Sequence, residues 1–113
     1  MIYDPVEHSI MELPGSINSA AANRNEAARL LSLDKGVLLG FVAEPGKTAA
    51  KYVNHETLVW RDAGVVLGYM SFVAEALGLA FCPLGISGQP YLTDYLSATD
   101  QIQAVGLAIL GET

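Results

Sequence analysis

The sequence predicts an α+β domain in which a small sheet packs on one long central apolar helix. Residues Val37–Val42 form a continuous apolar run, which is typical of a buried strand. Residues His55–Leu77 repeat apolar side chains at helical spacing on two adjoining faces, and Gln101–Leu110 shows a second strand pattern. A length of 113 residues fits a single domain over residues 1–113.

The first 31 residues are expected to form a hairpin followed by a helix. Met1–Leu13 is expected to form the hairpin, because the proline of Asp4-Pro5 fixes the φ angle of a turn position. Asn18–Leu31 is expected to be helical because it is rich in alanine. Either Asn18 or Ser19 is suited to cap the N-terminus of this helix.

Glycine and proline divide the rest of the chain. Glu44-Pro45-Gly46 ends the first buried strand, and Gly78 ends the long helix by accepting a left-handed conformation. The other expected elements are a partly helical segment at Lys47–Asn54, the long helix at His55–Leu77, a strand at Leu79–Cys82, a short helix at Gln89–Leu96 and a last strand at Gln101–Leu110.

The long helix is apolar around most of its circumference, and such a helix is normally buried on all sides. In so small a domain, this pattern favours a helix packed between this chain and another. Gly64 and Gly68 lie four residues apart and would let a neighbouring helix come close. A core helix that lies wholly within one chain is the alternative.

Composition limits the classes of partner. The apolar fraction is 51% and the mean hydropathy is +0.34, which suggests a surface that another subunit covers. The formal net charge is −6 and only six residues are Lys or Arg, which argues against nucleic acid because phosphates are neutralised by these residues. The sequence has no basic amphipathic helix, so binding to a membrane surface is not expected.

Cys82 is the one cysteine of the chain. It forms no internal disulfide, and it fits a reducing cytoplasm. We expect it to be a small buried apolar residue, since nothing near it in sequence activates a thiol. No signal peptide is recognisable, and the uncharged stretch Ala63–Ala74 is too short to span a bilayer.

Lys51-Tyr52, directly before the long helix, is the first candidate for chemistry. A lysine in an apolar site can act as a base, because desolvation disfavours the charged ammonium. A neighbouring tyrosine hydroxyl can donate or relay a proton. An exposed lysine beside a half-buried tyrosine is the alternative interpretation.

The loop after the strand Leu79–Cys82 is the second candidate. It contains Pro83, Leu84 and Gly85, and glycine lets a backbone N–H group approach a flat ligand closely. His55 and Asp62 share one face of the long helix but are too few to hold a metal ion, so no metal site is expected. The sequence has no P-loop, dinucleotide fingerprint or nucleophile elbow.

Several short segments together resemble the C-terminal half of the streptolysin-type peptide azoline dehydrogenases. These enzymes oxidise thiazolines and oxazolines and belong to the FMN-dependent nitroreductase superfamily. The resemblance covers nearly the whole chain in order and spacing. Its segments are Tyr3-Asp4-Pro5, His8, Leu13, Lys51-Tyr52, Arg61-Asp62-Ala63-Gly64, Ala74-Glu75-Ala76-Leu77-Gly78-Leu79, Cys82-Pro83-Leu84-Gly85 and Val105-Gly106.

The resemblance implies a nitroreductase-like half-fold that works with FMN at a dimer interface. Lys51 and Tyr52 would be the catalytic pair, and Pro83, Leu84 and Gly85 would lie against the flavin ring. The family's Arg-rich segment, which binds the FMN phosphate, precedes the region that this chain matches. A second subunit, or a homo-oligomer, would therefore have to provide the phosphate site.

Two departures from the family concern the long helix and the end of the chain. The helix has Gly68-Tyr69 where relatives often have Gln-Asn, and the end Leu110-Gly111-Glu112-Thr113 lacks the basic residue that often assists. Three hypotheses for the function follow. In the first, the chain is half of a split cytoplasmic dehydrogenase with a peptide-derived substrate. In the second, it is a non-catalytic small subunit that supports a flavin oxidoreductase, and in the third, it is a small binding module without flavin.

Overall fold

Strand β5 (Gln103–Glu112) lies at the centre of the main sheet. The computed structural model describes residues 1–12, 17–30, 36–96 and 102–112, with only the backbone at 17–20 and 94–96. In it, β5 runs between β3 (Val37–Ala43) and β4 (Leu79–Pro83) and is antiparallel to both. Residues 104–108 are all buried, which explains the continuous apolar sequence of this strand.

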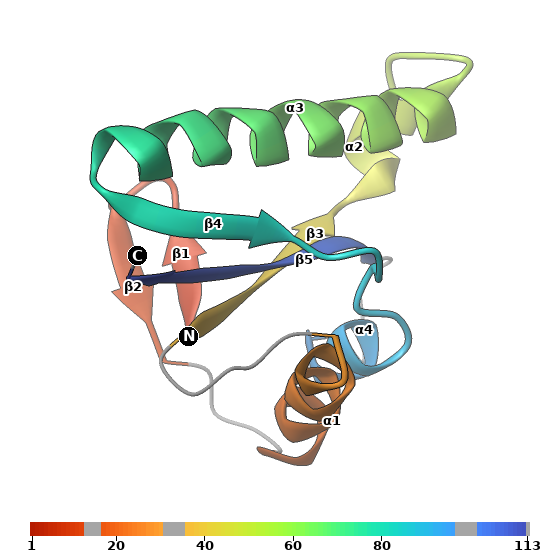
Figure 1. Cartoon of the computed structure of the whole chain (residues 1–113). Coiled ribbons are helices and arrows are strands. Elements are labelled where there is room, and N and C mark those ends of the chain that lie inside the picture. Colours follow the sequence, from red (N-terminus) through yellow and green to blue (C-terminus); the bar gives the residue numbers. More distant parts are fainter. Residues whose placement is uncertain (13–16, 31–35, 97–101, 113) are drawn as a thin grey trace.

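Helix α3 (His55–Ala76) covers one face of this sheet (Figure 1). Leu67 packs over Gly106 of β5, where a Cβ atom would lie 3.5 Å from Leu67 Cδ1. The side chains that are buried or half-buried on this side of the helix recur at helical spacing and are Val59, Ala63, Leu67, Met70 and Ala74. Beyond the helix, Gly78 has a φ of 71°, the left-handed conformation expected of it.

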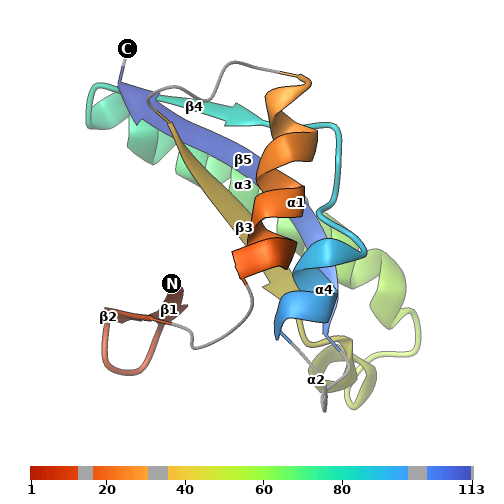
Figure 2. The ribbon, with the colours of Figure 1, turned by 90° about the horizontal axis from the view of Figure 1, so that it is seen from below.

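Helices α1 (Ile17–Ala28) and α4 (Tyr91–Leu96) lie together on the opposite face (Figure 2). Leu107 of β5 points toward this side, because successive residues of a strand face opposite ways. Leu107 is 1% exposed, and a Cβ atom built on Gly88 would lie 3.2 Å from its Cδ2 atom. The molecule therefore has three layers, with the sheet between α3 and the α1–α4 pair.

The N-terminal hairpin consists of β1 (Ile2–Asp4) and β2 (Ser9–Met11), which pair antiparallel. The Asp4 carboxylate organises the turn by accepting hydrogen bonds from the backbone N–H groups of Val6 at 2.8 Å and Glu7 at 3.2 Å. The Tyr3 hydroxyl lies 2.7 Å from Nδ1 of His8. Figure 2 shows this hairpin to one side of the helices and the main sheet.

The structure confirms the α+β class and most of the predicted elements. The partly helical segment is α2 (Pro45–Ala49), which starts earlier than expected because proline suits the first position of a helix. The final strand starts at Gln103 and reaches Glu112. Leu13, Leu31 and Gln101, the ends of three predicted elements, lie outside the described residues.

The expectation that α3 is buried on all sides is not met within this chain. Its side away from the sheet is exposed, and we call the five large apolar residues there the outer face: Val65, Val66, Tyr69, Phe72 and Val73. Tyr69 is 69% exposed and Phe72 is 78% exposed. The interpretation of α3 as a core helix wholly within one chain is therefore wrong.

Candidate functional site

The two candidate segments follow β3 and β4, which lie on opposite sides of β5. Strands β3 and β4 are both antiparallel to β5, so their carboxyl ends point in the same direction. Lys51 and Tyr52 follow β3 by way of α2, whereas Pro83, Leu84 and Gly85 end β4 and begin the next loop. Both segments therefore follow the carboxyl ends of strands that run in one direction, but these strands end at different levels of β5.

The strand register offsets these segments along β5. Ala43 at the end of β3 pairs with Gln103, whereas Pro83 at the end of β4 pairs with Ala108. This difference corresponds to about 17 Å, at roughly 3.4 Å for each residue of an antiparallel strand. Among the described residues, no hydrogen bond or ion pair joins the two segments.

The loop after β4 continues along β5 toward the edge where α2 begins. The Leu84 N–H group donates to the Leu107 carbonyl at 2.8 Å, which adds one hydrogen bond to those between β4 and β5. Five residues later, Gln89 Nε2 donates to the Ala104 carbonyl at 3.4 Å. This loop therefore spans the distance between the end of β4 and the Lys51-Tyr52 end of the sheet.

Lys51 and Tyr52 form a local pair held by the end of α2. Their backbone N–H groups both donate to the Thr48 carbonyl, each at 3.0 Å. The Lys51 Nζ atom lies 5.4 Å from the centre of the Tyr52 ring, within the range of a cation–π contact. Both side chains are exposed, with Tyr52 at 48%. The apolar surroundings that a lysine base requires are therefore not supplied by the described part of this chain.

The flavin-facing candidates are accessible. Pro83 and Gly85 are exposed and Leu84 is half-buried. A Cβ atom built on Gly85 would meet nothing within 4 Å, so a flat ligand has room to approach this backbone. Cys82 was expected to be buried, and this expectation is wrong: its side chain is exposed, and Sγ lies 3.7 Å from the Pro83 carbonyl oxygen.

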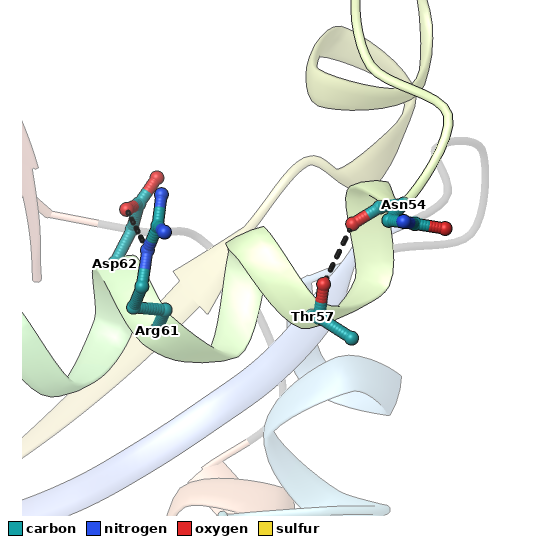
Figure 3. Close-up of polar contacts among 4 residues, drawn as sticks. All are labelled: Asn54, Thr57, Arg61 and Asp62. Atoms are coloured by element: carbon teal, nitrogen blue, oxygen red, sulfur yellow. Dashed lines mark hydrogen bonds and ion pairs between the residues drawn. The ribbon is translucent and has the colours of Figure 1, made fainter.

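His55 and Asp62 lie seven residues apart on α3. The Asp62 carboxylate lies 4.0 Å from Nε of Arg61, and both side chains are largely exposed (Figure 3). Within the described ranges, no three His, Cys, Asp or Glu side chains gather closely enough to hold a metal ion. In these same ranges, none of the helices has the length and apolar character needed to cross a membrane.

One surface residue was missed by the sequence reasoning. Phe72 was not singled out from the sequence, yet it lies on the outer face with Val65 and Tyr69. The signal was present in the sequence, since positions 65, 69 and 72 follow the three- and four-residue spacing of one helix face. Its large exposed ring makes this face more apolar than the sequence pattern alone suggested.

Comparisons of the chain with models of known protein families, with curated proteins and with solved structures found no match. Function must therefore be inferred from the residues and their geometry. The described residues offer an amine and a phenol side by side after α2, an open glycine loop after β4, and an exposed apolar helix face.

Proposed function

We propose that this chain is one subunit of an FMN-dependent oxidoreductase that dehydrogenates a peptide-derived substrate, such as an azoline ring that becomes an azole. The observation that carries the proposal is the exposed Lys51-Tyr52 pair, with its amine 5.4 Å from the phenol ring, at the end of the sheet toward which the β4 loop leads. The ordered resemblance to azoline dehydrogenases supports the same assignment. The fold is then a nitroreductase-like half-fold built around α3.

The two residues have complementary roles in such a reaction. Oxidation of an azoline removes a hydride and a proton from adjacent ring atoms, and FMN supplies the hydride acceptor when bound. The neutral amine of Lys51 takes the proton, and the Tyr52 hydroxyl relays it away. A partner that covers this end of the sheet would exclude water and favour the neutral amine over the ammonium.

The chain suits one end of the flavin better than the other. The open backbone at Gly85, with Pro83 and Leu84, fits the edge of a flat ring. The phosphate end needs cations, and two described ones face carboxylates: Lys47 lies 3.0 Å from Glu44, and Arg61 lies 4.0 Å from Asp62. We infer that the partner subunit supplies the phosphate site.

Purification of the chain with the products of neighbouring genes, and alone, tests the proposal. We expect a yellow complex with the visible absorption of oxidised flavin only when a partner is present. In that complex, Lys51→Ala should lower turnover by about 10²-fold or more while FMN stays bound. Lys47→Ala is the matched control, because this exposed lysine is one α2 turn away and outside the proposed site.

The alternative is a non-catalytic subunit that supports the assembly of a flavin oxidoreductase. The exposed outer face of α3 favours this role, since large apolar side chains on a surface mark binding sites. In this case Lys51→Ala leaves turnover unchanged, whereas a polar residue at Phe72 prevents assembly. A colourless protein under every pairing would contradict both proposals and leave a binding module without flavin.

A further inference from the structure

Strand β3 is an edge strand without the usual protection against pairing with another chain. Among the described strands its one neighbour is β5, and Figure 2 shows β5 between it and β4. Proteins commonly protect such an edge with proline or with charged side chains. The seven residues Val37–Ala43 include neither, whereas β4, the opposite edge strand, ends at Pro83, which has no N–H group to donate. The edge of β3 away from β5, which we call the free edge, therefore suits an added strand.

The register shows which backbone groups of β3 face the free edge. The Leu84 N–H group donates to the Leu107 carbonyl, so the backbone groups of Leu107 face β4. Gly40 lies opposite Leu107 on β3. Opposite residues of an antiparallel pair alternate between hydrogen-bonded and non-hydrogen-bonded positions, so the N–H and C=O groups of Gly40 point away from β5. Those of Leu38, two residues earlier, point the same way.

These backbone groups are available to a second chain. Within the part of the chain that the structure describes, neither Leu38 nor Gly40 has a hydrogen-bond partner for them. The pairing with β5 is regular from Val37 to Phe41, and its register shifts only after Phe41. The free edge therefore presents donors and acceptors at alternate residues, in the pattern that an extended peptide backbone matches.

We propose that the free edge binds an extended segment of the peptide substrate, which adds a strand beside β3 and bonds to the backbone of Leu38 and Gly40. This inference rests on the proposed function, because that function supplies the peptide. The edge leads to the proposed site, since β3 continues through α2 to Lys51 and Tyr52. Backbone hydrogen bonds give affinity without reading most of the peptide's side chains.

The segment bound at the free edge is free of heterocycles. An azoline ring incorporates the nitrogen of one residue and the carbonyl carbon of the residue before it, so these positions lose a backbone donor and an acceptor. Pairing with β3 therefore requires an unmodified stretch of the peptide. The ring lies beyond this stretch, toward Lys51 and Tyr52. The free edge thus holds the peptide while the ring is oxidised elsewhere on the chain.

Fluorescence anisotropy of the full chain without flavin tests this inference. The probe is a fluorescein-labelled seven-residue peptide of valine and threonine, with two derivatives that each carry three N-methyl groups. Methyl groups on alternate residues leave the N–H groups along one edge of the peptide intact, whereas methyl groups on consecutive residues block both edges. We expect the first derivative to bind within about threefold of the unmethylated peptide, and the second at least about tenfold more weakly.

A variant of β3 provides a second, independent measurement. Leu38→Pro removes the outward N–H group and should weaken binding of the unmethylated peptide by about tenfold, while proline is tolerated on an edge strand. Leu38→Ala is the matched control, because it shortens the side chain but keeps the N–H group. Circular dichroism verifies that both variants are folded. If Leu38→Pro does not fold, the two methylated peptides still decide the question.

Three outcomes would overturn the inference. The first is no binding of the unmethylated peptide, or equal binding of the two methylated derivatives. The second is a folded Leu38→Pro variant that binds the peptide as the native chain does. The third is a native dimer in sedimentation equilibrium that Leu38→Pro dissociates, which would assign the free edge to a second copy. Each of these leaves the flavin proposal intact, because that proposal is tested by the colour and turnover of the assembled complex.

Discussion

Leu92 of α4 packs against Gly40 of β3, so that a Cβ atom on Gly40 would lie 2.7 Å from Leu92 Cδ2. This contact holds the α1–α4 layer close to the sheet. We expect Gly40→Ala to lower the free energy of unfolding by about 1 kcal/mol, because Gly40 is exposed and only the end of the half-buried Leu92 side chain has to shift. Urea denaturation measures the change. Gly46→Ala is the control, since its Cβ would meet nothing within 4 Å, and an equal loss there would contradict the explanation.

Asn23 is the buried polar link between α1 and the loop before α4. It is 3% exposed, and its amide is placed to donate to the Gly88 carbonyl at 3.1 Å and accept from the Leu92 N–H at 3.2 Å. Asn23→Asp keeps the acceptor but loses the donor and buries a charge, so we expect a loss of about 2 kcal/mol or more. Asn25→Asp, at an exposed position of the same helix, should change thermal stability little.

Leu107 is the largest fully buried side chain among the described residues, at 1% exposure. Leu107→Ala should cost about 2–5 kcal/mol, because it removes apolar contacts and leaves a cavity between the sheet and α4. Leu30→Ala is the matched control, since Leu30 is 53% exposed and should cost less than about 1 kcal/mol. Similar midpoints for the two variants in chemical denaturation would show that the core does not lie around β5.

Gly85 distinguishes flavin contact from a structural role of the β4 loop. A Cβ atom at this exposed position would meet nothing within 4 Å, so we expect Gly85→Val to fold as well as the native protein. If the loop lies against the flavin ring, the same variant should weaken FMN retention in the assembled complex by roughly tenfold, by blocking close approach of the backbone. Flavin content per complex measures this loss, and normal content would exclude Gly85 from the flavin site.

The helices and strands were largely predictable, because each has a local signature. Periodicity identified α3, the apolar run Val37–Val42 identified β3, and Gly78 marked the end of the long helix. These signals depend on residues within a few positions of one another. The exposure of Cys82 was predicted wrongly, because a strand residue is buried or exposed according to the elements that cover it.

The candidate site was predictable only as a set of residues. Sequence reasoning selected Lys51, Tyr52 and the loop from Pro83 to Gly85, but the register of β3 and β4 on β5 decides how far apart they lie. That register comes from pairing between segments far apart in the chain. No local pattern specifies the offset between Gln103 and Ala108 that separates the two segments.

The sequence by itself determined the α+β class, the order of the elements and an apolar fraction of 51%. Local spacing and composition are sufficient for these properties. Only the tertiary structure decided which side of α3 meets the sheet and which side is exposed with Tyr69 and Phe72. Both sides of the helix are apolar, so the choice depends on how α3 fits over Gly106 of β5, a contact between residues far apart in the chain.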